Sequence, residues 1–289
     1  MPNIPTANQY IDAHVHFWNP NQIDYPWLVD APAINRPTFP ADLDAARGEL
    51  SHELAGIVFV EADCNPAHAL REAEWVTALA AQDARIRGIV AHAPLQKGEA
   101  AGEDLAALQA LPLVKSIRRL IQSEPLGFST GADFVRGVQL LPEFGLSFDL
   151  CIFHSQLGDV LRLVEQCPDV SFILDHMGKP GIAAGLTEPW KSQIRELAQR
   201  PDIHCKLSGV VTEADKQHWT AAQVQPYMEH ILDCFGPERV VFGSDWPVVN
   251  LAADYRRWFA LATQTISAYS PAEQQMILHD NAVRFYRLG

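Results

Sequence analysis

One pattern recurs along the chain: a short apolar run, rich in β-branched residues, is followed by a stretch with helical spacing. The apolar runs cover residues 10–18, 54–62, 86–95, 113–121, 146–154, 170–178, 203–210 and 239–247. Helical spacing is clearest over 66–82, 156–168, 188–201 and 270–288, where Ser270, Pro271 and Glu273 form a capping box. Short buried strands that alternate with helices predict βαβ units and a parallel sheet.

Eight such units predict a (β/α)8 barrel in the α/β class, also called a TIM barrel. With 289 residues and no linker-like segment, the chain is expected to form a single domain over 1–289. The competing architecture is a doubly wound open sheet. That fold typically has fewer strands and a glycine-rich phosphate turn, and the sequence contains neither a GxGxxG motif nor a P-loop.

The charge of the chain bears on its partners. The formal net charge is −13 and the isoelectric point is near 5.2. A nucleic-acid binder needs a basic face, and an anionic membrane surface also attracts basic residues. We therefore expect a small-molecule substrate, with no nucleic acid and no membrane as partner. Assembly into a homo-oligomer is left open.

The five cysteines and the N-terminal segment indicate a cytoplasmic protein. The cysteines are scattered, odd in number and never arranged as CxxC, which favours reduced, structural thiols. No apolar run reaches the roughly 18–20 residues that a membrane-spanning helix needs. The opening "MPNIPTANQY" has no basic segment followed by an apolar one, so we expect no signal peptide.

Titratable side chains gather at one end of the predicted strands. In a (β/α)8 barrel the active site lies at the carboxyl ends of the strands. Each of the eight runs carries a titratable group in its later part: His14 and His16, Glu61, His92, Arg118 and Arg119, His154, Asp175 and His176, Lys206, and Asp245. Eight apolar strands are not expected to do this by chance, so the sequence predicts an active site there.

The first run, "IDAHVHFWNP", predicts half of a metal site. Side chains two residues apart on a strand point to the same face, so His14 and His16 are expected to point together. Read with His154, Glu61 and Asp245, they form a set of nitrogen and oxygen ligands that suits zinc, manganese or iron. The alternative is that the two histidines are structural and are held by neighbouring polar residues.

Other strand-end residues are candidates for catalysis and substrate binding. Asp245 is expected to act as general base or proton shuttle, and His176 to hydrogen-bond the attacking water or the carbonyl oxygen. Strand alternation places Arg118 inside the barrel, facing substrate or Glu61, and Arg119 outside. Arg118, Arg119, His92, Trp27 and Trp246 are the predicted substrate-binding residues, and each of the last three could instead serve packing.

Together the segments "IDAHVHFW", "LDHMGKP", "KLSGVVTEAD", "FGSDWPV" and "DNAVRFYRL" resemble the amidohydrolase superfamily. More narrowly, they resemble its amidohydrolase-related (amidohydrolase 2) group, which includes sugar lactonases such as L-fuconolactonase and L-rhamnonolactonase. The resemblance covers about residues 10–288. It implies a distorted barrel whose functional positions are His14, His16, His154, His176 and Asp245. No lysine lies on the fifth strand, so it implies one divalent ion, zinc first, with manganese, iron or a metal-free site as alternatives.

These observations predict a cytoplasmic, metal-dependent hydrolase of carbohydrate metabolism that opens the ring of a lactone. The substrate is expected to be a sugar-acid lactone or a related carboxylated lactone, attacked by an activated water. One alternative is a metal-dependent, non-oxidative decarboxylase of an aromatic or unsaturated acid on a similar barrel. The other alternative is a barrel that binds a ligand without turnover.

Overall fold

The computed structural model describes residues 8–289 and contains one sheet of eight parallel strands in sequential order. The strands are β1 (Gln9–Val15), β2 (Glu53–Val60), β3 (Ile86–Ala91), β4 (Val114–Arg118), β5 (Ser147–Leu150), β6 (Phe172–Leu174), β7 (Ile203–Ser208) and β8 (Val240–Gly243). The predicted (β/α)8 barrel is therefore confirmed, and all eight apolar runs contain one strand each.

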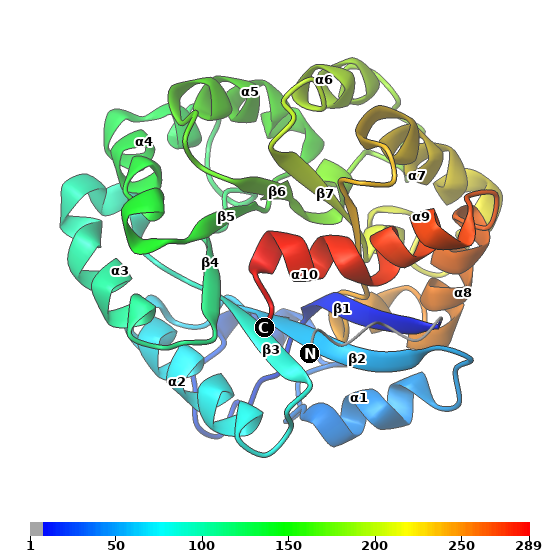
Figure 1. Cartoon of the computed structure of the whole chain (residues 1–289), viewed down its shortest axis with the longest axis horizontal. Coiled ribbons are helices and arrows are strands. Elements are labelled where there is room, and N and C mark those ends of the chain that lie inside the picture. The colour runs from blue at the N-terminus through cyan, green and yellow to red at the C-terminus, as the bar shows by residue number, and fades with distance from the viewer. Residues whose placement is uncertain (1–7) are drawn as a thin grey trace.

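Helices form an outer ring around the strands (Figure 1). The α-helices are α1 (Pro40–Arg47), α2 (Ala69–Ala80), α3 (Gly102–Gln109), α4 (Ala132–Gln139), α5 (Leu157–Gln166), α6 (Trp190–Leu197), α7 (Ala221–Phe235), α8 (Tyr255–Thr265), α9 (Pro271–Gln275) and α10 (Asn281–Tyr286). Short 3-10 segments are η1 (Pro26–Asp30), η2 (Pro66–His68), η3 (Leu95–Ala101), η4 (Phe128–Thr130), η5 (Leu141–Phe144), η6 (His154–Gln156), η7 (Asp175–Gly178), η8 (Val210–Glu213) and η9 (Val248–Leu251). The capping box of Ser270 and Glu273 opens α9 as predicted, but the expected single helix contains a π-helical segment, η10 (Met276–Asp280).

Two apolar clusters follow from the alternation of side chains along the strands. Outward residues pack beneath the helices in the larger cluster. Inward residues of β1, β2, β3, β6 and β8 pack against α10, which crosses the end of the barrel where the strands begin (Figure 1). Because α10 closes that end, a ligand can approach the interior only from the carboxyl ends of the strands.

The barrel closes between its first and last strands by bonds just beyond β8. The N–H of Asp245 donates to the carbonyl of His14 at 2.8 Å, and the N–H of His16 donates to the carbonyl of Trp246 at 2.8 Å. Val15 and Trp246 form an isolated parallel bridge at the same place. We call this contact between β1 and the segment after β8 the seam.

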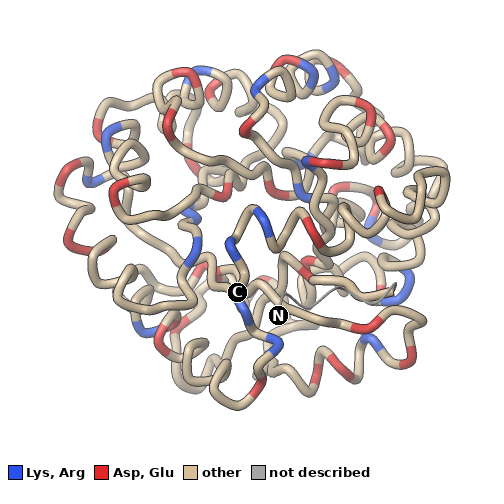
Figure 2. Tube along the Cα trace, viewed as in Figure 1, with Lys and Arg blue, Asp and Glu red and all other residues tan. Residues whose placement is uncertain are grey.

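The remaining predictions about the chain as a whole can be compared with residues 8–289. Acidic residues are spread around the outer ring (Figure 2). None of the five cysteines is paired with another, and four of them are buried. Among the described residues no helix has both the length and the apolar character needed to span a bilayer. The N-terminal stretch in which we expect no signal peptide falls mostly on residues 1–7, outside the described part of the chain.

Candidate active site

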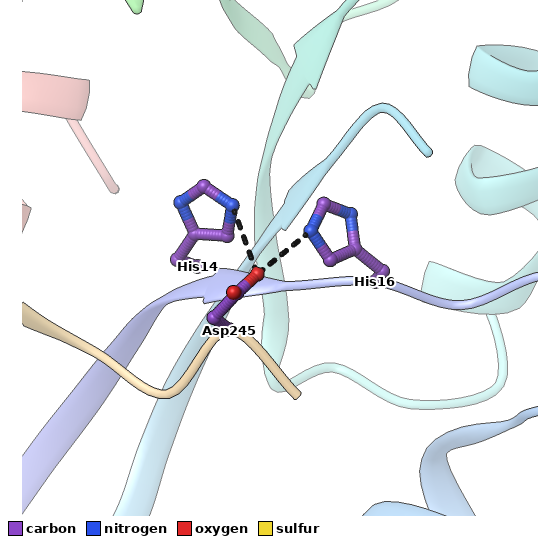
Figure 3. Close-up of side chains that lie close together, drawn as sticks. All are labelled: His14, His16 and Asp245. Atoms are coloured by element: carbon purple, nitrogen blue, oxygen red, sulfur yellow. Dashed lines mark hydrogen bonds and ion pairs between the residues drawn. The ribbon is translucent and has the colours of Figure 1, made fainter. Parts of the chain in front are cut away.

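His14, His16 and Asp245 meet at the seam, on the side where the strands end (Figure 3). Oδ1 of Asp245 lies 3.3 Å from Nε2 of His16 and 3.7 Å from Nε2 of His14. The register of β1 against β2 shifts between Asp12 and Val15. This irregularity lets Ala13 pack inside the barrel while the next residue, His14, also faces inward.

The hydrogen bonds of the two imidazoles show which nitrogens carry lone pairs. Nδ1 of His16 lies 2.8 Å from the carbonyl of Val60, which can only accept, so Nδ1 carries the proton. Nη1 of Arg118, which can only donate, lies 3.3 Å from Nε2 of His14. Both rings place Nε2 beside Oδ1 of Asp245. Three acceptors that face one another need a cation or a proton between them.

Two glycines allow this close approach. A Cβ atom on Gly209 would lie 2.4 Å from the Cβ of Asp245, and one on Gly243 would lie 2.7 Å from the Cβ of His14. Asp245 itself has a φ of +62°, an uncommon conformation for a residue other than glycine. Strained backbone of this kind concentrates at functional sites.

His176 completes the ring of imidazoles around Asp245. Its Nδ1 lies 3.9 Å from Oδ2 of Asp245 and 2.9 Å from the hydroxyl of Ser208, and its φ is +50°. Burial lowers the pKa of His176 to about 4, so the ring is neutral at neutral pH. Burial, followed by the Lys206 ammonium, lowers the pKa of His14 well below its usual value.

Asp245 is ionised despite its burial. Burial acts to raise its pKa, but the imidazoles of His176, His16 and His14 together hold the pKa below its ordinary range. Among residues 8–289, the ion-pair partners of Asp245 within 4.0 Å are these three histidines and no lysine or arginine. A cation brought from outside would therefore find a carboxylate that the protein has not neutralised.

Arg118 lies inside the barrel as predicted, and each of its three nitrogens already has a protein partner. Nε donates to Oε1 of Glu61 at 2.6 Å, Nη2 donates to the carbonyl of Glu61 at 2.5 Å, and Nη1 lies 3.3 Å from Oδ2 of Asp175. The other carboxylate oxygen of Glu61 accepts from the N–H of Asp63 at 2.8 Å. Glu61 therefore holds Arg118 in place, and among residues 8–289 it does not lie in a group of potential metal ligands, so its role as a ligand stays a prediction.

A second buried ion-pair cluster lies below the first. The ammonium of Lys206 on β7 lies 2.6 Å from Oδ2 of Asp149 on β5 and 2.9 Å from Oδ1 of Asp175. Asp149 also accepts from the hydroxyls of Ser116, at 2.5 Å, and Tyr286, at 2.7 Å. All of these side chains are fully buried.

The charges in the barrel floor do not balance. Counted in the ionised form, four carboxylates face two cations, so 2 − 4 leaves a net charge of −2. The carboxylates are Glu61, Asp149, Asp175 and Asp245, and the cations are Arg118 and Lys206. Buried charges that lack partners are costly. One divalent cation among His14, His16 and Asp245 would neutralise the excess, so these residues fit a single metal ion.

An open cavity of about 500 Å³ leads down to this cluster. Its lining combines a floor of titratable groups with a mixed wall: His16, Trp27, Ala62, Asp63, Arg118, Leu120, Gln122, Cys151, His176, Lys179, Asp245 and Val248. Nζ of Lys179 donates to Oε1 of Gln122 at 2.5 Å, and because this amide is neutral, Lys179 keeps its positive charge.

The structure does not bring His154 to the metal cluster. Strand β5 ends at Leu150, and His154 begins the 3-10 segment η6, where it is partly exposed. In residues 8–289 the groups able to hold a metal are His14 with His16 and Asp245, and His14 with Asp175 and His176. The prediction placed His154 at the end of its strand because the apolar run continues three residues past the last strand residue.

Three predicted substrate-binding residues also lie elsewhere. Trp27 lines the cavity, but Trp246 is 1 % exposed and packs against Phe17, because the backbone turns at Asp245. His92 and Arg119 line a neighbouring groove of about 600 Å³. Arg119 points away from the barrel interior, as predicted, and binds Gln96 and Glu124 there.

Sequence reasoning did not assign a site role to Lys206, Asp149, Asp175 or Lys179. Strand alternation could have identified Lys206 and Asp149 as residues that face the barrel interior. Ser147 and Asp149 occupy alternate positions of β5, as Lys206 and Ser208 do on β7, so each pair shares a face. No comparable signal identifies Lys179, because it lies in a loop with a φ of +46°.

Glu72 on α2 makes the stability of the protein depend on pH near this site. Burial, reinforced by the charge of Glu61, raises its pKa to about 8. In the folded state the Glu72 carboxyl therefore keeps its proton at pH values above about 4.3, where the unfolded chain loses it. The stability that this bound proton contributes is lost as the pH rises through 8. Between pH 6 and 9 the free energy of unfolding should fall, by on the order of 2 kcal/mol from this group.

Urea denaturation at the two pH values tests this prediction with two variants. Glu72→Gln should remove most of the loss, whereas Glu74→Gln, at an exposed position of the same helix, should retain it. An identical pH dependence for Glu72→Gln and the wild type would contradict the prediction.

A parallel eightfold barrel with imidazoles and a carboxylate gathered at the carboxyl ends of its strands defines an enzyme of the (β/α)8 class. Comparison with known proteins makes this more specific. The sequence profile described as Amidohydrolase matches residues 11–288, and the chain belongs to the amidohydrolase family.

Several relatives match over almost the whole chain. An L-fucono-1,5-lactonase of Burkholderia multivorans is 33 % identical over 292 residues, which cover 96 % of each chain. An L-fucono-1,5-lactonase of Burkholderia ambifaria is 29 % identical and covers 96 % of this chain and 95 % of its own. A crystal structure of an amidohydrolase from Burkholderia multivorans with bound zinc is 31 % identical, with a TM-score of 0.85, and covers 97 % of this chain and all of that one.

Proposed function

We propose that the protein is a hydrolase that opens a lactone ring with water activated at the His14, His16 and Asp245 cluster. The observation that carries the proposal is the Asp245 carboxylate, which lies within 4.0 Å of three imidazoles at the floor of an open cavity. The relatives named as lactonases support the reaction class, because they match this chain over nearly its full length.

The chemistry follows from the positions of these groups. Asp245 accepts a proton from water as the water oxygen attacks the lactone carbonyl carbon. The bond from that carbon to the ring oxygen then breaks, and the proton passes to the departing oxygen to give a hydroxy acid. His176 is placed beside Asp245 to hydrogen-bond the water or the carbonyl oxygen. A divalent ion bound by His14, His16 and Asp245 would polarise the carbonyl and lower the pKa of bound water.

The charges around the cavity favour a neutral substrate. Arg118 has its donors engaged by Glu61 and Asp175, and Lys179 binds Gln122. Asp63 and Asp245 add negative charge to the lining. Among the residues that line the cavity, Lys179 is a cation bonded to a neutral amide, but Asp63 and Asp245 outnumber it, and hydroxyl groups can bond to carboxylate and amide oxygens. We therefore propose a polyhydroxylated, uncharged lactone rather than a carboxylated one.

The same observation bears on the alternative of a decarboxylase. That reaction needs a site for the substrate carboxylate, and the arginine expected to provide it is already paired with Glu61. Lactone hydrolysis requires only an activated water and a polarised carbonyl, which this cluster can supply.

A pH-indicator assay on a lactone library tests the proposed function. Ring opening releases a proton at neutral pH, so neutral aldonolactones should acidify a weakly buffered solution faster with the protein than without it. Lactones that carry a carboxylate should react more slowly. Acidification no faster than the spontaneous rate for every lactone would reject the proposal, and faster reaction of the carboxylated members would reject the neutral substrate.

Metal content provides a second prediction. The purified protein should hold about one equivalent of a divalent ion, and the His14→Ala/His16→Ala double variant should lose it, because each neutral imidazole supplies one bond. His218→Ala, at an exposed position, is the matched control and should keep the ion. Elemental analysis decides, and full activity of a metal-free protein would favour the alternative without metal.

A further inference from the structure

The two groups of potential metal ligands in the barrel floor share His14 but differ in what neutralises their carboxylate. In the first group, Asp245 has only imidazoles around it. In the second group, Asp175 has the Lys206 ammonium at 2.9 Å and the Arg118 guanidinium at 3.3 Å. The protein thus supplies its own cations to the carboxylate of the second group and none within 4.0 Å to the carboxylate of the first.

Lys206 is held in the manner of a bound cation. Its ammonium lies 2.6 Å from Asp149, 2.9 Å from Asp175 and 3.2 Å from Nδ1 of His14. The lysine and all three neighbours have no exposed surface. Lys206 is not among the residues that line the cavity, so its ammonium does not contact a substrate bound there.

We propose that the Lys206 ammonium takes the place of a second metal ion, so that the centre is a pair of cations of which only one is exchangeable. The inference rests on the metal-binding part of the proposed function. Two carboxylate oxygens converge on the ammonium, and carboxylates are ligands that manganese accepts readily. Without Lys206 the excess charge of the floor would rise from −2 to −3, and the space of the side chain would become available to an ion and water.

This arrangement also orients His14. Its Nδ1 lies 3.4 Å from Oδ1 of Asp175 and 3.2 Å from the Lys206 ammonium, so these two groups fix the position of the ring while its Nε2 lies in the cluster with Asp245. Because Lys206 is covalently attached, Asp175 cannot lose its cation to a chelator. The fixed charge therefore keeps the orienting group in place when the exchangeable ion dissociates.

The test counts manganese in the full-length protein and two variants. Each protein is stripped with a chelator, saturated with Mn²⁺, freed of excess ion by gel filtration and analysed for metal. Wild type should bind one equivalent and Lys206→Ala two, since its cavity exposes both carboxylates. Lys206→Met fills the same space without charge and should bind no more than one. Lys216→Ala, at an exposed position, should match wild type.

Several outcomes would overturn the inference. If the wild-type protein binds two ions, or none, Lys206 does not take the place of a second ion beside a single exchangeable one. Folded Lys206→Ala with the wild-type content would show that the vacated place does not bind a cation. If Lys206→Ala unfolds when stripped, Mn²⁺ should restore its thermal transition more than it restores that of Lys206→Met. If Lys206→Ala does not refold at Mn²⁺ concentrations that saturate the wild type, the inference is rejected.

The readout separates this inference from the proposed reaction. Ion counting does not depend on turnover, so absence of lactonase activity would reject the proposed function and leave the manganese result to stand alone. Conversely, if the protein is a lactonase and its Lys206→Ala variant binds one ion, the proposed function stands and the role assigned to Lys206 is rejected.

Discussion

Replacing Asp245 with asparagine should lower kcat for lactone hydrolysis by on the order of 10²–10⁴, the usual contribution of a general base. The amide cannot accept the proton of water, and it also removes the negative charge that faces the three imidazoles. Asparagine tolerates the φ of +62° at this position, so the backbone of the seam should be kept. Steady-state rates, with circular dichroism to verify folding, provide the measurement.

The matched control for this variant is Asp233→Asn, an exposed position on α7. It changes the net charge of the protein equally and should leave the rate unchanged. A folded Asp245→Asn protein with wild-type kcat would remove Asp245 from the mechanism and would leave the cluster without a base.

Replacing Arg118 with methionine should lower the free energy of unfolding by about 3–5 kcal/mol, which is the usual cost of removing one partner from a buried ion pair. The guanidinium is 4 % exposed in a network with Glu61 and Asp175, and its removal leaves both carboxylates without this cation. The main role of the Arg118 side chain is thus to stabilise the floor of the cavity rather than to bind substrate. Urea denaturation of the chelator-treated proteins measures the loss.

A double-mutant cycle tests whether Glu61 is the partner that matters. The double variant Glu61→Gln/Arg118→Met should lose less stability than the sum of the two single variants, because neither charge remains unpaired. Arg119→Lys is the neighbouring control and should cost less than 1 kcal/mol, since its ion pair with Glu124 lies near the surface. Additive losses in the cycle would place the partner of Arg118 elsewhere.

Strand alternation and strand-end position allowed the fold and the centre of the site to be predicted. His14 and His16 flank the outward Val15, and Asp245 is the titratable residue that follows β8, so these three could be predicted to meet once eight strands were recognised. Arg118 could likewise be placed inside the barrel and Arg119 outside.

The remaining positions depend on where each strand stops, which an apolar run does not specify. His154 and Trp246 both follow a strand within the same apolar run, yet the backbone has already turned before each of them. The pairing of Arg118 with Glu61 depends on distances between side chains of different strands. A sequence indicates that two charges face the interior, but not that they neutralise each other before a substrate arrives.

The seam has a consequence for the order in which the site can be made during synthesis. His14 and His16 are among the first residues translated, whereas Asp245 follows the eighth strand and Tyr286 follows later still. A nascent chain that has left the ribosome only as far as β7 holds two imidazoles without their carboxylate. The cluster can therefore exist only after the eighth strand has been translated and has joined the first. Loading of an ion must follow translation of nearly the whole barrel, so it depends on the ions present around the finished fold.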